Sequence, residues 1–184
     1  MAERTAAGIR EATTAQLTDQ DLGALRRLFA AAWPDGGFSN EDWTHAMGGR
    51  HWLVEEDGRI VSHASVVERV LEVGGRPLRT GYVEAVATAP SARRRGLASR
   101  AMRAVGAHIR THFELGALST GHPEFYERLG WARWRGPTFV RTDEGLVRAQ
   151  EEDGGILVLV TPATPAGLDP AAPISCRARV GDAW

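Results

Sequence analysis

The sequence has 184 residues, 43% of them hydrophobic, and a formal net charge of −1. This is enough apolar material for one substantial core, so we expect a single domain over residues 1–184. The near-zero charge argues against a nucleic-acid partner. No apolar run reaches the roughly 18 residues that span a bilayer, and the first residues lack the apolar stretch of a signal peptide. We therefore expect a cytoplasmic protein with no membrane partner.

The residue types narrow the chemistry further. All 22 cationic residues are arginine, which excludes a Walker A lysine, a Schiff-base lysine and a lysine nucleophile. No two glycines have the Gly-x-Gly spacing of a dinucleotide-binding loop. The single cysteine, Cys176, excludes an internal disulfide. His108 and His112 have i, i+4 spacing but no evident third ligand, so we expect no metal site.

Two helices are expected near the N-terminus. Residues 18–33 place apolar side chains at helical spacing, with Thr18 as the N-cap and Asp21 at N3. A second, short helix begins after Ser39, with Asp42 at N3, and ends at a pair of glycines, 48–49.

The pattern then changes to a period of two, which predicts three strands at residues 51–55, 59–72 and 78–88. Asp57-Gly58 and Gly74-Gly75 separate the strands, and both pairs are typical of two-residue hairpin turns. We therefore expect an antiparallel meander.

The remaining elements alternate between helix and strand. Apolar residues at helical spacing predict a helix from residue 97 to about Phe113. A strand, a short helix and two further strands are expected at residues 115–119, 123–129, 131–141 and 155–161. The tail from Pro162 is rich in proline and alanine, and we expect it to wrap the surface.

The segment Gly81–Arg103 contains the most informative motif of the chain. A strand and a Pro-containing turn lead into the loop Arg93-Arg94-Arg95-Gly96-Leu97-Ala98, and a helix follows directly. Main-chain N–H groups at a helix N-terminus are unpaired and carry the positive end of the helix dipole, so they bind phosphates. Gly96 lets the backbone approach such a group closely, and the small Ala98 leaves room for it. The sequence therefore predicts an anion-binding cradle.

This loop resembles the Arg/Gln-x-x-Gly-x-Gly/Ala loop of the GCN5-related N-acetyltransferases (GNAT), which grips the pyrophosphate of acetyl-coenzyme A. The order of the expected elements is similar as well. The resemblance implies an α/β (α+β) fold, the GNAT acyl-CoA N-acyltransferase fold: a mixed, mostly antiparallel sheet flanked by helices, with splayed central strands. It also implies that Arg93–Ala98 and the main chain of Val86 and Thr88 hold acetyl-coenzyme A, with coenzyme A as the product.

Glu84 lies in the middle of the strand before the loop. Alternation places it on one face with Tyr82, Val86 and Thr88, with Ala85 on the other. A carboxylate in a central strand is costly unless it is paired, hydrated or functional. We expect Glu84 to take a proton from an amine nucleophile through water, and such help is typically worth about two to four orders of magnitude. The alternative is an ion pair with an arginine.

The main-chain N–H near Val86 is a candidate donor to the thioester carbonyl oxygen. As charge develops on that oxygen, one such donor is typically worth about 3 kcal/mol.

Tyr126 lies in Phe125-Tyr126-Glu127-Arg128-Leu129-Gly130-Trp131. This segment resembles the GNAT signature Phe-Tyr-x-x-x-Gly-Phe, whose tyrosine approaches the coenzyme sulfur. Proton transfer from a tyrosine of pKa about 10 to a thiolate of pKa about 8.5 is uphill by about 2 kcal/mol. We therefore expect Tyr126 mainly to hydrogen-bond the leaving sulfur, unless its pKa is lowered. The alternative is an amphipathic helix whose tyrosine covers the core.

Acidic residues gather in three segments of the chain. They are Asp35, Glu41 and Asp42; Glu151, Glu152 and Asp153; and Asp182 beside the carboxylate of Trp184. Each group by itself is typical of a solvated loop. Together with Glu84 they would form a pocket that attracts a polycation, and we include Asp35 and Asp153 among its binding residues.

Further motifs resemble one branch of the GNAT family, the aminoglycoside 2′-N-acetyltransferases. The motifs are Phe38–Trp43, Gly48-Gly49, Gly81–Glu84, Leu115–Ser119, Gly130-Trp131, Gly136-Pro137-Thr138 and Gly181-Asp182-Ala183-Trp184. The resemblance runs from about residue 8 to the last residue. It implies that the ammonium and hydroxyl groups of the drug bind six residues, to which the tail 162–184 contributes: Asp42, Glu84, Ser119, Glu152, Asp182 and Trp184. It also implies the Trp184 carboxylate as a possible second proton acceptor, and a homodimer.

These observations lead to an expected function, antibiotic resistance by direct transfer of acetyl from acetyl-coenzyme A to the 2′-amine of an aminoglycoside. No acyl-enzyme is expected, because the only thiol, Cys176, lies far from the motifs in sequence. Two alternatives remain open. One is acetylation of a peptide, a polyamine or a cell-wall amino sugar, and the other is a polycation-binding module without turnover.

Overall fold

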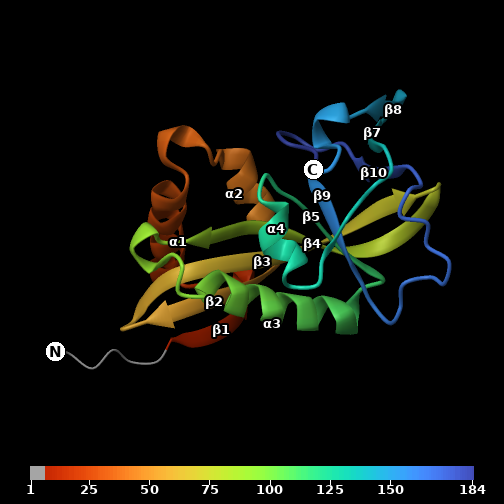
Figure 1. Ribbon diagram of the computed structural model, residues 1–184. Helices are drawn as coiled ribbons and strands as arrows, with labels where there is room; N and C mark the ends of the chain where they lie inside the picture. The colour runs from red at the N-terminus through yellow and green to blue at the C-terminus, as the bar shows by residue number, and fades with distance from the viewer. Residues whose placement is uncertain (1–6) are drawn as a thin grey trace. The chain divides into compact units, whose positions relative to one another are not determined.

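The computed structural model describes residues 7–184, apart from the side chain of Asp35. The chain forms two compact units, the first from Met1–Val67 and Val83–Val105 and the second from Glu68–Tyr82 and Gly106–Trp184. Strands β3 (Arg59–Val73) and β4 (Arg76–Thr88) and helix α3 (Leu97–His112) contribute residues to both units. Figure 1 shows these elements in the colours of their order along the chain. The single domain expected over residues 1–184 remains a prediction.

The first unit begins with a strand that the sequence analysis missed, β1 (Gly8–Thr13). It pairs antiparallel with β2 (Arg50–Glu56), which in turn pairs antiparallel with β3. In β1 only Ala12 is buried. The strand therefore has no buried face that an alternating pattern in the sequence could have indicated. Its pairing with β2 is what defines it.

The two helices of the first unit have the capping boxes that the sequence predicts. Helix α1 (Asp19–Ala32) begins after Thr18, whose Oγ1 accepts the N–H of Asp21 at 3.2 Å, while the Asp21 carboxylate accepts the N–H of Thr18 at 2.9 Å. Helix α2 (Asn40–Ala46) begins after Ser39 with the same reciprocal pair to Asp42, at 3.1 and 2.7 Å. Each box satisfies two main-chain donors that the first helical turn leaves unpaired.

Both predicted hairpin turns are confirmed. Asp57 and Gly58 have φ angles of +47° and +71°, and Gly74 and Gly75 have φ angles of +56° and +81°. Two consecutive residues with positive φ form the type I′ turn, whose twist matches that of the strands it connects.

The core of the first unit packs α1 against its strands. Leu25, Leu28 and Phe29 from α1 form one buried cluster with Leu53 of β2 and Ala87 of β4. Because these side chains are almost fully buried, the helix fixes the part of β4 that leads to the arginine loop.

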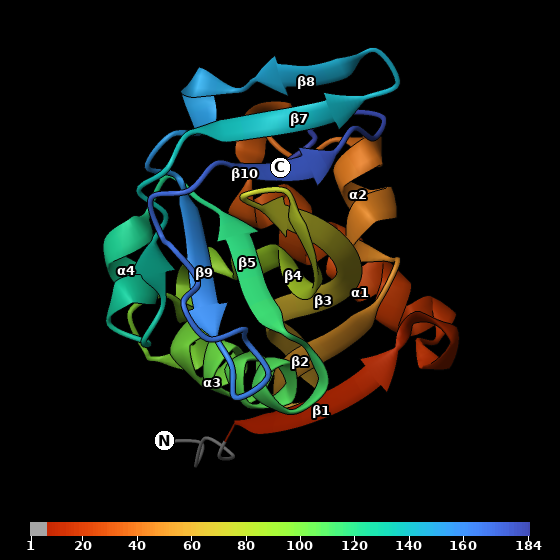
Figure 2. The same ribbon diagram turned by 90° about the vertical axis from the view of Figure 1, so that its right-hand side faces the viewer.

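The second unit contains the strand order β6-β9-β5-β4-β3-β10-β7-β8. Its strands are β5 (Leu115–Ser119), β6 (Ala132–Arg133), β7 (Thr138–Thr142), β8 (Gly145–Arg148), β9 (Ile156–Val160) and β10 (Ile174–Arg177). Figure 2 shows β10, β7 and β8 side by side, with β8 at the edge. Strand β4 pairs parallel with β5 from Thr80–Leu115 to Tyr82–Ala117, and the register ends there although β4 continues to Thr88. The sheet is therefore mixed and mostly antiparallel, as expected.

Two expectations for the C-terminal third were wrong. The strand expected at residues 131–141 is divided into β6 and β7, because the chain between them turns and Gly136 lies against the main chain of Ala171 and Ala172. The tail beyond Pro162 does more than wrap the surface, since it contains β10, which pairs parallel with β7 and antiparallel with β3. Strand β10 is too short for its periodicity to be read from the sequence.

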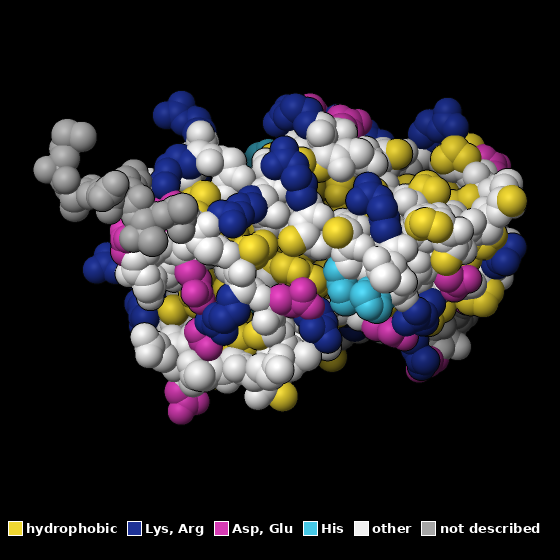
Figure 3. Space-filling view, turned by 90° about the horizontal axis from the view of Figure 1, so that it is seen from below, with side chains coloured by type: hydrophobic (Ala, Val, Ile, Leu, Met, Phe, Trp, Pro, Cys, Tyr) yellow, Lys and Arg dark blue, Asp and Glu magenta, His cyan; other side chains and the backbone are white. Residues whose placement is uncertain are grey.

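In residues 7–184 no helix combines the length and the apolar character needed to cross a membrane. On the face that Figure 3 displays, arginine and acidic side chains are interspersed. Neither sign of charge dominates that face.

Candidate active site

The arginine loop lies in the first unit, between β4 and α3. Arg94 and Gly96 have positive φ angles, +58° and +76°, and α3 begins at Leu97 with no acidic residue in its first turn. A Cβ atom on Gly96 would meet nothing within 4 Å, so the main chain there is open. The unpaired N–H groups and the positive end of the helix dipole thus remain available to an anion.

Two of the three arginine side chains in the loop are bonded to the protein. Arg95 makes a two-pronged ion pair with Glu56, with N–O distances of 2.9 and 2.5 Å, and Arg93 donates to the carbonyl oxygen of Ala32 at 3.3 Å. These contacts hold the loop against β2 and α1. The side chains of Arg93 and Arg95 are therefore engaged with the protein, whereas the main chain at Gly96 is open.

Glu84 lies just before an irregularity in β4. Ala85 has a φ of +50°, a left-handed conformation that is uncommon for a residue with a Cβ atom. An extended strand alternates its faces only while its residues stay extended. The alternation that grouped Glu84 with Val86 and Thr88 is therefore interrupted at Ala85, and the expected sharing of one face does not follow. Glu84 itself is half-buried, and its carbonyl oxygen accepts the hydroxyl of Ser65 at 3.1 Å.

The sequence analysis missed a group of buried polar side chains beside this irregularity. Ser62, His63 and Ser65 of β3 and His51 of β2 are all fully buried. Ser62 donates to the carbonyl oxygen of Ala87 at 2.8 Å. A signal existed in the sequence, because Ser-His-Ala-Ser interrupts an otherwise apolar strand, and buried polar groups need partners.

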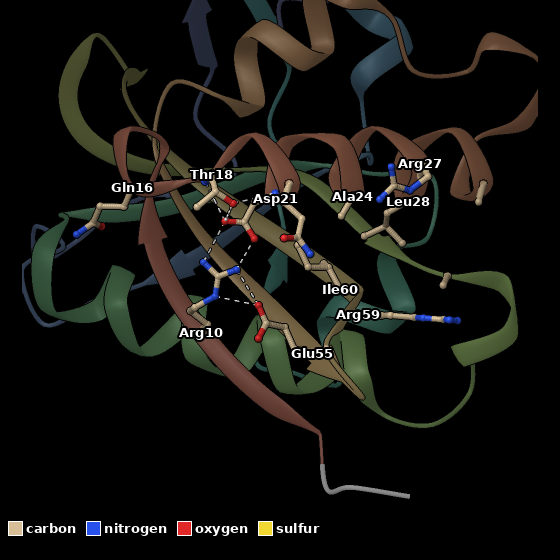
Figure 4. A pocket seen from close by; sticks show the side chains of 14 residues that line it. Arg10, Gln16, Thr18, Asp21, Ala24, Arg27, Leu28, Glu55, Arg59 and Ile60 are labelled. Atoms are coloured by element: carbon tan, nitrogen blue, oxygen red, sulfur yellow. Dashed lines mark hydrogen bonds and ion pairs between the residues drawn. The ribbon is translucent and has the colours of Figure 1, made fainter.

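A cavity of about 750 Å³ also lies in the first unit, beside α1, β2 and β3. Figure 4 shows Arg10 of β1 reaching Asp21 of α1 and Glu55 of β2, with N–O distances of 2.6 and 2.7 Å. Arg10 pairs with both carboxylates and thereby connects β1 to α1 and β2. Arg10 therefore has a structural role.

In the second unit, four of the expected binding residues form one hydrogen-bonded and electrostatically linked group. Ser119, at the end of β5, donates its hydroxyl to Glu152 at 2.8 Å. Burial raises the pKa of Glu152, the Ser119 bond opposes the change, and the negative charges of Asp182 and Glu151 raise it further. Asp182 accepts the main-chain N–H of Trp184 at 3.1 Å. Acidic side chains are thus held close together here although like charges repel.

Arginines hold the tail that carries Asp182 and Trp184. Arg69 donates to the carbonyl oxygen of Ala183 at 2.7 Å, and Arg179 donates to that of Asp182 at 2.7 Å and to Trp184 O at 3.4 Å. Trp184 is 4% exposed. The tail is therefore packed into the second unit, and its last residues have defined positions.

Tyr126 belongs to the short helix α4 (Pro123–Glu127) of the second unit and is buried. Its ring contacts those of Phe125 and Trp131, at centroid distances of 4.8 and 6.4 Å. Burial raises the pKa of Tyr126 to about 12, and a hydrogen bond with the Thr120 side chain opposes the change. The pKa of Tyr126 is thus raised, not lowered, so Tyr126 is not suited to give its proton to a thiolate.

Comparison with known proteins places the chain in a family. Residues 13–134 match the family model of the acetyltransferase (GNAT) domain. The chain is also 41% identical over 175 residues to the aminoglycoside 2′-N-acetyltransferase of Mycolicibacterium fortuitum, covering 93% of this chain and 89% of that one. The protein belongs to the GNAT acetyltransferases. The predicted family resemblance is thereby confirmed, and the protein is an acetyltransferase with acetyl-coenzyme A as its cosubstrate.

Solved structures confirm the expected GNAT fold. YhbS of Escherichia coli, a GNAT-family N-acetyltransferase solved in complex with CoA, superposes with a TM-score of 0.67 at 13% identity, over 92% of this chain and 89% of that one. A GCN5-related N-acetyltransferase from Kribbella flavida gives a TM-score of 0.57 at 24% identity over 71% of this chain. The chain spans only 34% of that longer protein.

The arginine loop of this GNAT acetyltransferase fits the pyrophosphate of its cosubstrate. The fit rests on the open main chain at Gly96, the positive φ angles before α3 and the absence of acidic residues from its first turn. Helices α1 and α2 differ from α3, because acidic side chains lie in their first turns and occupy their N-termini.

The sole cysteine of this GNAT acetyltransferase, Cys176, is fully buried in β10. Its thiol donates to the carbonyl oxygen of Ala183 at 3.2 Å, and burial raises its pKa. A thiol attacks as its thiolate, so Cys176 is unsuited to carry an acyl group.

Asp42, Asp153 and Asp35 were also expected to bind the substrate. Asp42 closes the capping box of α2. Asp153 accepts bonds from Thr138 at 2.8 Å and from Arg148, and the Arg148 bonds lower its pKa to about 2. Both carboxylates thus have structural partners, and their binding roles remain predictions. The side chain of Asp35 lies outside the described part of the chain.

Proposed function

We propose that this GNAT acetyltransferase transfers the acetyl group of acetyl-coenzyme A to the 2′-amine of an aminoglycoside antibiotic. The observation that carries the proposal is the 41% identity, over 93% of the chain, to the aminoglycoside 2′-N-acetyltransferase of M. fortuitum. The acidic group around Glu152 supports it, because aminoglycosides are polycations and converging carboxylates attract such ligands.

The proposed binding residues lie in both units. In the second unit Ser119, Glu152, Asp153, Asp182 and Trp184 would bind ammonium and hydroxyl groups of the drug. In the first unit Asp35, Asp42 and Glu84 would do the same. The Trp184 carboxylate as a second proton acceptor is part of this proposal.

Glu84 is the proposed general base. A carboxylate is a weak base toward an ammonium group of pKa about 8, so the proton would leave the 2′-amine through one or two waters rather than by direct contact. Because Glu84 is half-buried, it is partly removed from bulk solvent, which favours such a relay over exchange with free water.

The proposed coenzyme contacts lie in the first unit. The loop Arg93–Ala98 would hold the pyrophosphate, mainly through the N–H groups after Arg93, because that of Arg93 donates to the carbonyl oxygen of Pro90 at 3.4 Å. The main chain of Val86 and Thr88 would hold the pantetheine arm. The N–H of Val86 would donate to the thioester carbonyl oxygen, where negative charge develops as the amine attacks.

Tyr126 would stabilise the leaving thiolate by donating a hydrogen bond to it. With a pKa of about 12, the phenol stays protonated at neutral pH and keeps its proton after the bond forms. Acetyl transfer would be direct, since the buried Cys176 is unsuited to accept the acyl group.

The test measures coenzyme A release from acetyl-coenzyme A with a panel of amines. We expect turnover with gentamicin and tobramycin, which carry a 2′-amine, and little with kanamycin A, which has a 2′-hydroxyl. Equal turnover of both kinds of drug would reject the 2′ position. Turnover confined to peptides, polyamines or cell-wall amino sugars would reject the drug as substrate, and binding of the drug without acetyl-coenzyme A binding would indicate a non-catalytic module.

We also propose that the protein is a cytoplasmic homodimer. Sedimentation of the purified chain tests the dimer, and fractionation of the producing cells tests the location.

A further inference from the structure

Ala85 is held in its unusual conformation by a histidine. Its φ is +50°, and such a residue persists only where the surrounding structure determines it. The Nδ1 atom of His63 lies 2.8 Å from the carbonyl oxygen of Ala85. His63 is fully buried, and the ring of Phe29 packs edge-on against it at a centroid distance of 5.1 Å. The imidazole therefore has a fixed position from which to bind this carbonyl group.

The bond from His63 acts on more than Ala85. The carbonyl group of Ala85 and the N–H group of Val86 belong to one planar peptide unit, in which they point in opposite directions. A donor at the carbonyl oxygen fixes the orientation of that N–H. It also polarises the amide, so that the N–H becomes a stronger donor.

The carbonyl group of Ala85 determines which nitrogen of His63 carries the proton, and His51 meets the other nitrogen. Because a carbonyl oxygen only accepts, the proton of a neutral His63 must lie on Nδ1, and Nε2 must accept. The Nδ1 of His51 lies 3.0 Å from that Nε2, and the Nε2 of His51 lies 2.8 Å from the hydroxyl of Thr14. The Thr14 hydroxyl donates to the carbonyl oxygen of Met47 at 2.6 Å and lies 3.2 Å from that of Gly49, so its one proton does not set the tautomer of His51.

The chain of contacts thus has one direction. The Nδ1 of His51 donates to the Nε2 of His63, and the Nδ1 of His63 donates to the main chain of β4. Burial keeps both rings neutral at pH 7, since it lowers the pKa of His51 to about 4 and that of His63 to about 3. The positive charge of one ring would also oppose protonation of the other.

We propose that His63 is a positioning residue for acetyl transfer. Through the carbonyl group of Ala85 it orients and polarises the N–H of Val86, and His51 holds it in the required tautomer. The inference rests on the proposed function, in which that N–H binds the thioester carbonyl oxygen. His63 is fully buried, so its proposed role is to position the peptide unit and not to contact a substrate.

A pair of variants separates the two nitrogens of the ring. In His63→Asn the amide nitrogen can occupy the place of Nδ1 and still donate to Ala85, whereas in His63→Gln the amide lies near the place of Nε2 and the donor is lost. We expect His63→Gln to lower kcat about 10- to 100-fold with an unchanged KM for acetyl-coenzyme A. This is less than the roughly 100- to 1000-fold typical for loss of an oxyanion donor, because the N–H of Val86 remains and only its support is lost. His63→Asn should recover most of this loss.

The matched control is Ser62→Ala. Ser62 also lies on β3 and also donates to a β4 carbonyl oxygen, that of Ala87 at 2.8 Å. The peptide unit of that carbonyl contains the N–H of Thr88 rather than that of Val86, and Ser62 also bonds the Thr88 hydroxyl at 2.8 Å. We expect this variant to be less stable by about 1 kcal/mol, since it loses a buried hydrogen bond. Because Thr88 is proposed to hold the coenzyme, any kinetic change should appear in the KM for acetyl-coenzyme A, and kcat should stay within about twofold. Equal loss of kcat in Ser62→Ala and His63→Gln would overturn the proposal.

A second readout needs no turnover. In the ligand-free protein, ¹⁵N NMR of the imidazoles should show a neutral His63 with its proton on Nδ1. The amide resonance of Val86 should move in His63→Gln and stay in place in Ser62→Ala. A proton on Nε2 of His63, or an unmoved Val86 resonance, would overturn the inference. If no amine is acetylated, the proposed function fails by itself, and these spectra still decide whether His63 controls the peptide unit.

Discussion

The hydroxyl of Ser119 donates a hydrogen bond to the carboxylate of Glu152, across 2.8 Å between Oγ and Oε2. The two residues lie on different elements, the end of β5 and the loop before β9. The bond stabilises the ionised form of Glu152, whereas burial and the nearby charges of Asp182 and Glu151 stabilise the protonated form, and the net effect is a raised pKa. A bound cation would therefore stabilise the ionised form of Glu152.

We first predict that Glu152→Gln weakens aminoglycoside binding about tenfold at pH 7, because a hydrogen bond to a charged group is lost. The difference in affinity between the wild type and the variant should shrink as the pH falls through the raised pKa of Glu152. Below that pKa Glu152 is protonated, and a neutral carboxyl group does not attract a cation. Isothermal titration calorimetry with tobramycin at pH 7, 6 and 5 measures the difference.

The control for this prediction is Glu144→Gln, at an exposed turn between β7 and β8. It should bind the drug as tightly as the wild type does at every pH. If Glu152→Gln binds the drug as tightly as Glu144→Gln at every pH, Glu152 does not belong to the binding site.

Tyr126→Phe should lower kcat by about 10- to 100-fold, because one donor to the developing thiolate is lost. Since burial raises the pKa of Tyr126 to about 12, the ratio of the two kcat values should stay constant from pH 7 to pH 10. Steady-state kinetics across this range measure the ratio. If the wild type instead shows an alkaline loss of kcat near pH 9 to 10 that the variant lacks, Tyr126 titrates in that range and acts as an acid.

Acid should destabilise the protein through its histidine pair. In the unfolded chain both rings have an ordinary pKa near 6.5, whereas burial in the folded protein lowers the pKa of His51 to about 4 and that of His63 to about 3. Below pH 6.5 the unfolded chain takes up protons that the folded protein does not. The stability conferred by the neutral pair is thus present above pH 6.5 and is lost toward pH 4, at about 1.4 kcal/mol per pH unit for each histidine.

Urea unfolding at pH 7, 6 and 5 measures this slope. His51→Gln should reduce the slope by about half, since one titrating group is gone. His112→Gln, at an exposed position of α3, should leave it unchanged. The same slope in all three proteins would show that the pair is not buried in its neutral form.

Two adjacent glycines should differ sharply on replacement by alanine. A Cβ atom on Gly49 would lie 1.9 Å from the carbonyl oxygen of Val66, which is main chain of β3 and cannot move aside, whereas a Cβ atom on Gly48 would lie 3.3 Å from that of His45. We expect Gly49→Ala to lower the free energy of unfolding by about 3 kcal/mol or more, and Gly48→Ala by about 1 kcal/mol or less. Urea denaturation of the two variants compares them, and similar losses would show that β2 and β3 are not held this closely at Gly49.

Much of the fold could be read from local patterns. The capping boxes at Thr18 and Ser39, the two turns with positive φ and the arginine loop before α3 all lie where the sequence predicts them. Each depends on interactions among residues a few positions apart, so the information is contained in a short stretch of chain.

The weaker predictions concern elements that depend on distant partners. Strands β1, β8 and β10 were missed because each is defined by pairing: β1 with β2, β8 with β7, and β10 with β3 and β7. The interruption at Ala85 was missed because alternation is a rule for a regular strand, and His63 on another strand is what binds the irregular carbonyl group.

By itself, the sequence determined the kind of protein, the place of the arginine loop before α3 and most of the helices and strands, because propensity, capping and turn chemistry are short-range. Only the tertiary structure decided the protonation behaviour of Tyr126, Glu152 and the histidine pair. A pKa shift depends on how much water is removed and which charges come near, and both are set by residues that meet only after folding.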